Sequence, residues 1–263
     1  MRKYLFIFKT QIISNLQYVG NVLIGFIGNF VMLFILFNLW KYLYSDPNEL
    51  INGYNMFQMT WYVIITELLW MGLGGRKLVG KISEDVITGN VAYNINKPYS
   101  YVGYVLATHL GDIFIKSIVL SILFMITGLV FLGGFPSLTL VNVLVIVLTM
   151  ILATVISTLF ASSIGLLAFF FENSRSFWWL YSKFILILGT IFPIEFFPGV
   201  LQKILSFSPV FVSSYGPAKL FVDFSWSTAW EILLAQLIYL AISYGICEFI
   251  YRKGVRKINV NGG

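Results

Sequence analysis

Cysteine, histidine and charged residues are all scarce in this sequence. Cys247 and His109 are the single cysteine and the single histidine of 263 residues, which excludes an internal disulfide and disfavours a metal site built from either residue type. Charged residues make up 11% of the chain and hydrophobic residues 59%, with a mean hydropathy of +0.87. Soluble proteins do not have this composition. We therefore expect an all-α membrane protein, with no nucleic-acid partner despite the net charge of +6.

Apolar runs of membrane length recur along the chain. A span needs about 20 residues, so the chain has room for six, with little left for a soluble domain. We expect a single transmembrane domain over residues 1–263. Its six transmembrane helices are expected at residues 19–42, 56–73, 104–132, 138–171, 177–192 and 228–249. The fourth run is too long for a perpendicular span, so it must tilt or extend past the membrane.

The first 17 residues combine Arg2, Lys3 and Lys9 with apolar side chains. The apolar run is broken at Lys9 and no small-residue cleavage site follows, which argues against a signal peptide. We expect an N-terminal amphipathic helix that lies in the inner membrane interface.

Residues 194–227 are apolar but are interrupted by prolines. The resulting pieces are too short to cross a membrane, although Gly199–Phe207 is expected to form a short helix. Broken backbone is tolerated at membrane depth only where protein buries it or where it lines a cavity. We therefore predict a re-entrant helical hairpin that enters from the outer face, between the fifth and sixth spans.

The longest polar interval is Gly72–Ser100, between the second and third spans. Within it, Val79–Asn90 has the pattern of an amphipathic helix. Its apolar positions are Val79, Ile82, Val86 and Ile87, and its polar positions include Lys81, Ser83, Glu84 and Asp85. Such a helix below the membrane is suited to contact a soluble partner. The alternative is a solvated connecting loop.

The positive charges fix the expected orientation. With both termini in the cytoplasm, the inner segments hold 12 of the 17 Lys and Arg residues and the outer segments hold 3. Lys116 and Lys183 lie inside spans, near their inner ends. Because positive residues accumulate in cytoplasmic loops, this orientation is strongly favoured.

A partial match to a phosphate-binding loop occurs at Gly75–Lys81. Ile82 stands where that loop needs a Ser or Thr for magnesium, and a membrane span, not a strand, comes before it. We therefore expect no ATP hydrolysis by this chain.

A few ionisable residues fall within or close to the expected spans. Asp112 and Lys116 stand four residues apart on one helical face. We expect them to form an ion pair at the membrane interface, and the alternative is a proton or substrate relay. Glu67 and Lys183 lie close enough to the inner ends of their spans to extend toward water. We expect His109 to be a hydrogen-bonded interface residue, and Glu195 to be hydrated at the start of the proline-rich segment.

The polar interval resembles the cytoplasmic loop of ABC-2 type transporter permeases, in the subgroup with the pattern I-x-x-D-I-x-x-G-x-I-A-Y-x-L-x-[KR]-P. The matching positions are Asp85, Gly89, Ala92, Tyr93, Lys97 and Pro98. The later segment Ile164–Phe221 also resembles that subgroup, at Trp178, Trp179, Pro193, Phe197, Pro198, Leu201 and Pro209. Val86 and Asn96 depart from the pattern, where isoleucine and leucine are expected.

The resemblance implies a permease subunit of an ABC exporter in a bacterial cell membrane. Two copies of a separate ATPase would bind ATP and Mg²⁺, and a second permease, identical or homologous, would complete the dimer. The substrate would be a drug, peptide or lipid. The residues that would couple the permease to the ATPase are Ile82, Glu84, Asp85, Val86 and Gly89.

We expect the substrate path between two permeases, because six spans pack too tightly to leave a wide pore in one. The outer gate would be formed by Phe192, Pro193, Phe196 and Phe197, although these aromatics are equally suited to ordinary interface packing. A secondary transporter or channel independent of ATP, a membrane-embedded enzyme and a signalling subunit are the alternatives. The first would require internal symmetry or charges at mid-membrane, and neither is evident.

Overall fold

The computed structural model describes residues 2–46, 48–72, 74–95, 97–171 and 173–261, and every regular element in these ranges is helical. The α-helices are α1 (Arg2–Leu16), α2 (Val19–Leu43), α3 (Met56–Gly72), α4 (Gly75–Ile87), α5 (Val91–Ile95), α6 (Tyr101–Leu132), α7 (Leu140–Leu166), α8 (Ser174–Ile185), α9 (Gly199–Ser206), α10 (Gly216–Val222) and α11 (Trp226–Asn261). Shorter elements are the 3₁₀ turns η1 (Leu167–Phe169) and η3 (Ile194–Phe196) and the π-helical segments η2 (Leu186–Ile191) and η4 (Phe211–Tyr215).

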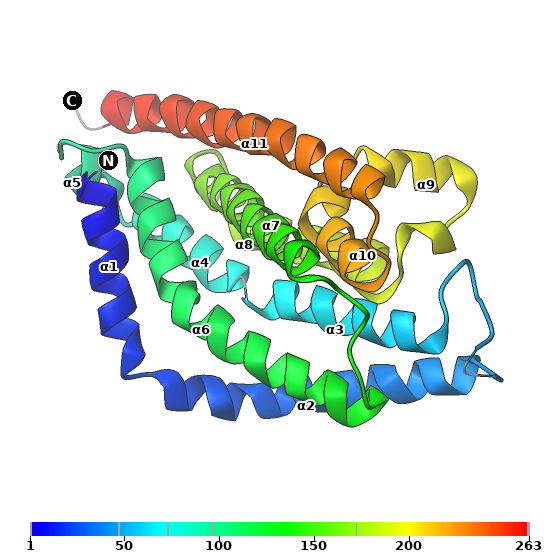
Figure 1. The fold of residues 1–263 in the computed structure, drawn as a ribbon. Helices are drawn as coiled ribbons and strands as arrows, with labels where there is room; N and C mark the ends of the chain where they lie inside the picture. The colour runs from blue at the N-terminus through cyan, green and yellow to red at the C-terminus, as the bar shows by residue number, and fades with distance from the viewer. Residues whose placement is uncertain (1, 47, 73, 96, 172, 262–263) are drawn as a thin grey trace.

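Helix α3 is the centre of the bundle. It lies between α2 and α6 on one side and α7 and α10 on the other (Figure 1). Of its 17 residues, 12 are buried, because apolar side chains surround the whole helix and such a helix is stable only inside a protein or a membrane. Its largest buried side chains are Trp61 and Tyr62, and the Tyr62 hydroxyl donates a hydrogen bond to the Gly189 carbonyl at 2.7 Å.

Four helices of the described chain are long and apolar enough to cross a membrane. They are residues 20–43 of α2, all of α6, residues 140–169 of α7 with η1, and residues 226–257 of α11. These correspond to the first, third, fourth and sixth expected spans. The second expected span is α3, which is one residue shorter than 18, and its expected end at Leu73 lies outside the described residues. The fifth is divided between α8 and η2. The six-span arrangement therefore stays a prediction.

Several boundaries differ from the expected ones. Helix α6 begins at Tyr101, where the Ser100 hydroxyl caps the helix by accepting a hydrogen bond from the Gly103 N–H. In the long fourth run, the α-helix ends at Leu166 and the 3₁₀ turn η1 follows. The α-helix therefore does not continue to the expected end at Phe171. Helix α11 continues past residue 249 to Asn261, so the basic residues there belong to a helix and not to a loop. Glu172 and Asn96 lie outside the described residues.

The proline-rich stretch forms a series of short helices packed inside the protein. After Pro193 come η3, α9, η4 and α10, and the last two of these are almost wholly buried against α3 and α7. The Gln236 amide donates hydrogen bonds to the carbonyls of Thr149 and Val212, both at 2.9 Å. These bonds give two backbone carbonyl groups an additional hydrogen-bond partner, and polar groups without a partner are costly to bury in an apolar environment. The expected short helix is confirmed as α9, one residue shorter than predicted.

Helix α1 lies along the N-terminal half of α6. Phe8 packs edge-on against Phe114 with ring centroids 5.7 Å apart. A Cβ atom at Gly111 would lie 2.8 Å from the Phe8 carbonyl oxygen, so the absence of a side chain at Gly111 allows the close approach. Apolar side chains such as Phe6 remain exposed on the other side, as expected for an amphipathic helix at an interface.

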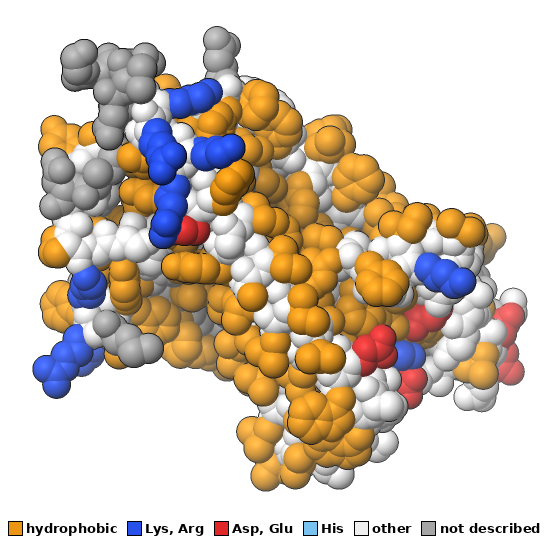
Figure 2. All heavy atoms as spheres, turned by 90° about the horizontal axis from the view of Figure 1, so that it is seen from above, with side chains coloured by type: hydrophobic (Ala, Val, Ile, Leu, Met, Phe, Trp, Pro, Cys, Tyr) orange, Lys and Arg blue, Asp and Glu red, His pale blue; other side chains and the backbone are white. Residues whose placement is uncertain are grey.

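The two ends of the molecule differ in charge. Both termini lie at the left end in Figure 1, close to α5, whereas the α2–α3 connection and α9 lie at the right end. On the face shown in Figure 2, Lys and Arg gather at the left end and most Asp and Glu at the right, with a broad hydrophobic surface between them. This distribution agrees with the orientation expected from the loop charges.

Candidate functional site

Helix α4 is the expected amphipathic helix, with shifted ends. It starts at Gly75, four residues before the expected Val79, after Gly74 adopts the left-handed conformation at φ +53. It ends at Ile87, where the Thr88 N–H and hydroxyl both donate to the Glu84 carbonyl, at 2.9 and 2.7 Å. Gly89 follows at φ +75, a conformation that suits glycine. Asn90 is therefore outside the helix.

The apolar face of α4 packs on the inner part of the bundle. Leu78, Val79 and Ile82 are buried together with residues of α6, α7 and Cys247. A Cβ atom at Gly165 of α7 would lie 2.8 Å from the Ile82 Cβ atom, so Ile82 occupies the space that Gly165 leaves open. Val86 is half-buried at the edge of this cluster. Ile82 is 1% exposed, so a coupling role for it would act through its packing on α7 and not through direct contact with a partner. That role stays a prediction.

One expectation for α4 is wrong: Ile87 was expected on the apolar face but is 64% exposed. Asp85 is partly exposed, and its carboxylate accepts a hydrogen bond from the Tyr101 hydroxyl at 3.4 Å. Its coupling role stays a prediction. Burial raises the pKa of the Asp85 carboxyl, against the opposing effects of Lys81 and of the Tyr101 hydrogen bond. Of the two acids, Glu84 alone is fully exposed.

Glu84, Ile87 and Tyr93 are exposed on α4 and α5, and Tyr93 is 76% exposed. Further exposed residues of these helices are Arg76, Lys77, Lys81 and Ala92. Gly89 lies between the two helices and is half-exposed. Sequence reasoning missed Ile87 and Tyr93 as contact candidates. An exposed isoleucine and tyrosine next to an acid resemble the centre of a protein interface, where aromatic residues are enriched.

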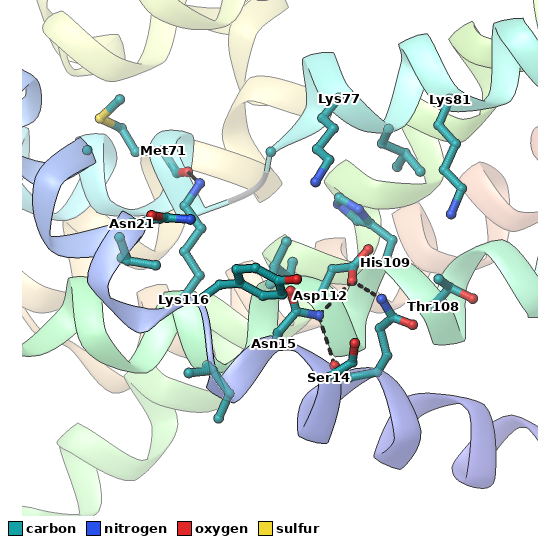
Figure 3. Close-up of a pocket in the computed structure, with 18 of the residues that line it drawn as sticks. Ser14, Asn15, Asn21, Met71, Lys77, Lys81, Thr108, His109, Asp112 and Lys116 are labelled. Atoms are coloured by element: carbon teal, nitrogen blue, oxygen red, sulfur yellow. Dashed lines mark hydrogen bonds between the residues drawn. The ribbon is translucent and has the colours of Figure 1, made fainter.

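A cavity of about 730 Å³ lies on the other side of α4, bounded by α1, α2, α4 and α6. Figure 3 shows Lys77 and Lys81 extending from α4 toward α6, with Ser14 and Asn15 of α1 opposite. His109, buried and in contact with neighbouring groups, lines its wall. The sequence gives no pattern for this cavity, because its walls come from four separate segments.

Asp112 and Lys116 both line the cavity but do not pair with each other in the described structure. The Asp112 carboxylate accepts hydrogen bonds from the Gln11 and Asn15 amides of α1, the latter at 2.9 Å (Figure 3). Lys116 Nζ donates to the Met71 carbonyl at 2.9 Å, near the C-terminal end of α3. The expectation of an ion pair is therefore wrong, and each residue instead joins α6 to another helix.

The remaining ionisable residues of the expected spans differ in exposure. Glu67 is 4% exposed, so it lies inside the bundle and does not reach water as expected. Lys183 is exposed, which agrees with its expected position. Glu195 is partly buried, and its Oε1 atom accepts hydrogen bonds from the Tyr54 and Tyr215 hydroxyls at 3.0 and 2.6 Å. This carboxylate therefore joins three segments of the chain and is not simply hydrated.

The expected gate residues form an aromatic cluster at the opposite end from α4. Phe192 and Phe196 pack edge-on against Trp40 of α2, with centroids 5.9 and 5.7 Å away. Phe197 contacts Phe192 at 6.3 Å, and Pro193 is buried. In the single chain these side chains connect the segment after η2 to α2.

Comparison with known proteins places the chain in a family. No curated protein matches it. The family described as ABC-2 family transporter protein matches residues 30–262. This range includes α3 to α11, and with them every expected coupling and gate residue, but not α1. The chain therefore belongs to the ABC-2 transporter family, as its resemblance implied, and is a membrane-embedded permease component rather than an enzyme.

Proposed function

We propose that the chain is the transmembrane subunit of an ABC exporter that moves an amphipathic substrate, such as a drug, peptide or lipid. Permeases of this family work with ABC ATPases. In the proposed complex, two ATPase copies bind ATP and Mg²⁺ and contact a dimer of this chain, or of this chain with a homologous permease. The membrane is a bacterial cell membrane, with both termini in the cytoplasm.

The observation that carries this proposal is the two-sided arrangement of α4. One side is held on α7 by Ile82 against Gly165, and the other side exposes Glu84 and Ile87 at the basic end of the molecule. ATP hydrolysis can drive transport only through a contact that differs between nucleotide states. A helix fixed firmly to a long membrane helix would transmit movement of an ATPase to the bundle.

The six-span arrangement is part of the proposal. Helix α3 has 17 residues and α8 with η2 covers residues 174–191. At 1.5 Å per residue these elements are about 26 Å long, close to the roughly 30 Å hydrocarbon core. With six crossings, residues 194–227 form a re-entrant hairpin on the outer side. The burial of η4 and α10 supports this, because broken helices at membrane depth require protein around them.

The proposed substrate path runs between two permeases, and the cluster of Phe192, Phe196 and Phe197 closes its outer end. These aromatic side chains are suited to apolar cargo, because a water-filled pore is lined by hydrogen-bonding groups. Their contacts with Trp40 would make the gate responsive to movement of α2.

The coupling role is tested with the double variant Glu84→Lys and Ile87→Lys in the complex with its ATPase. We expect transport to fall roughly tenfold or more, the size of effect that interface hot spots produce, while membrane insertion is unchanged. The matched control is Glu231→Lys with Val200→Lys, which makes the same charge change at exposed positions of the other end. Normal transport by the first variant would exclude this surface as the coupling site.

A further inference from the structure

The cavity between α1, α2, α4 and α6 is long, and the side chains that line it differ along its length. It follows α6 from Tyr104 to Leu120, about 24 Å at 1.5 Å per residue. Near the inner end its wall includes Lys77, Lys81 and Thr108. Farther along, the apolar side chains of Val22 and Leu120 line it together with the amides of Asn21 and Asn29. Such a shape fits an amphiphile with a polar head and an apolar chain better than a small soluble ion.

The polar end carries more uncompensated positive than negative charge. Lys77, Lys81 and Lys116 line it together with the carboxylates of Asp85 and Asp112. None of the three lysines forms an ion pair within 4 Å with another described residue, although Lys81 lies close enough to Asp85 to favour the charged form of that carboxyl. Lys77 is close enough to Lys116 for the two ammonium groups to repel each other. The Asp112 carboxylate is already occupied by two amide donors from α1. Lys116 is partly buried, whereas Lys77 and Lys81 are exposed. An anion bound between the ammonium groups would offset their mutual repulsion.

A second observation also indicates a ligand. Thr108 is 7% exposed and its hydroxyl has no hydrogen-bond partner among the described residues, although buried polar groups are almost always paired. Thr108 lies on the cavity wall, on the same side as Lys81 (Figure 3). The N-terminus of α4 also meets the cavity at Gly74, without a side-chain cap, and helix N-termini favour anions.

We propose that this cavity binds the phosphate headgroup of an anionic lipid from the inner leaflet. Lys77 and Lys81 contact the phosphate oxygens, the Thr108 hydroxyl donates to the same group, and the acyl chain follows α6 toward Leu120. Lysine is a common phosphate ligand, and anionic lipids bind basic pockets between membrane helices on the cytoplasmic side. The apolar end of the cavity is the reason for assigning a lipid rather than free phosphate.

The site has a consequence for transport, and this part rests on the proposed function. Lys77 and Lys81 belong to α4, the helix proposed to contact the ATPase with its opposite surface. A lipid bound to these lysines therefore holds α4 from the cavity side. Occupancy would change how readily α4 moves, and so the rate of ATP hydrolysis by the complex.

Binding is measured on the purified permease alone, so that the ATPase is not involved. The probes are dihexanoyl phosphatidylglycerol, glycerol 3-phosphate as the headgroup alone, and dihexanoyl phosphatidylcholine, each titrated by isothermal calorimetry below its micelle concentration. We expect phosphatidylglycerol to bind, and the other two to bind roughly tenfold or more weakly. Equal binding of glycerol 3-phosphate would overturn the lipid assignment, and no binding of any probe would overturn the site.

Two variants locate the site. Lys77→Gln with Lys81→Gln is expected to weaken phosphatidylglycerol binding roughly tenfold or more, and Thr108→Val to weaken it less, with the fold retained. The matched control is Lys253→Gln with Arg256→Gln, which removes the same charge from exposed positions at the same end. An equal loss in the control would show non-specific attraction and contradict the proposal.

The consequence for transport is tested separately with the assembled complex. Phosphatidylglycerol is expected to change ATP hydrolysis by the wild-type complex but not by the Lys77→Gln, Lys81→Gln complex. If the lipid binds the permease but leaves hydrolysis unchanged, the binding site stands and the proposed link through α4 is wrong.

Discussion

Gly165 of α7 lies in close contact with Ile82 of α4. The Ile82 side chain fills the space beside it, and a Cβ atom there would be 2.8 Å from the Ile82 Cβ atom. Real contacts between such atoms are longer, so any side chain at position 165 must push α4 away from α7. Ile82 and Gly165 are 83 positions apart, and neither residue alone predicts the contact.

Replacing Gly165 with alanine should therefore destabilise the inner part of the bundle. We expect a loss of about 1–3 kcal/mol, as for overpacking in a core, measured as a lower midpoint of thermal unfolding in detergent. Gly28 of α2 is the matched control, because a Cβ atom there would meet no neighbouring group within 4 Å. Gly28→Ala should be neutral or slightly stabilising, since alanine favours a helix. Equal effects at both positions would contradict close packing of α4 on α7.

Residues whose role depends on the rotation of a helix could not be predicted from the sequence. The period of α4 correctly put Val79 and Ile82 inside, but Ile87, the last residue of the helix, is exposed. Asp85 faces Tyr101, a residue of the next long helix. Glu67 was expected near water but lies inside, because α3 is enclosed by its neighbours. These outcomes are set by contacts between segments and not by local pattern.

At the level of elements, apolar runs predicted the long helices and prolines predicted the short ones. The boundaries of α2 and α9 agree with expectation within one residue at each end, because turn and proline residues limit both. The end of α11 was misplaced, since basic residues after an apolar run are compatible with either a loop or a continued helix. The cavity could not be predicted, because α1, α2, α4 and α6 meet only in the folded protein.

Substitutions in the aromatic cluster of Phe192, Phe196 and Phe197 test whether the segment after η2 is a gate. We expect Phe197→Ala to change substrate-stimulated ATP hydrolysis of the assembled complex, with basal hydrolysis and expression near wild type, because a smaller side chain loosens the outer closure. Phe192→Ala should do the same, with some loss of stability from its contact with Trp40.

Val200→Ala is the control for this experiment, since Val200 is 76% exposed on the adjacent α9. If both phenylalanine variants show normal stimulation and transport, the cluster is structural and the substrate path lies elsewhere. A fall in thermal stability without any change in stimulation supports the same conclusion.

At the scale of the whole molecule, the basic and acidic residues are separated toward opposite ends. The end with both termini, α4 and α5 is basic, and the opposite end carries the acids of the α2–α3 connection (Figures 1 and 2). Positive residues remain on the cytoplasmic side of a membrane. The sequence predicts an orientation from the counts of charges in its segments, and this orientation stays a prediction.

Cysteine accessibility tests this orientation. In a Cys247→Ser background, single cysteines at Asn48 and Pro136 should react with an impermeant thiol reagent in whole cells, and cysteines at Gly89 and Lys257 should react only after the membrane is opened. Cys247 itself is buried, so its replacement removes background without altering the surface. Labelling of the Gly89 cysteine in intact cells would reverse the orientation.

The central claim is that the exposed surface of α4 and α5 contacts an ATPase, and photo-crosslinking measures this contact most directly. A photoreactive phenylalanine analogue at Ile87 or Tyr93 should join the permease covalently to its ATPase in the assembled complex. The control position is Tyr42, which is 86% exposed at the opposite end and should yield no such product. Crosslinking from Ile87 and Tyr93 but not from Tyr42 is the predicted result. Its absence at both inner positions, in a complex that transports normally, would contradict the account.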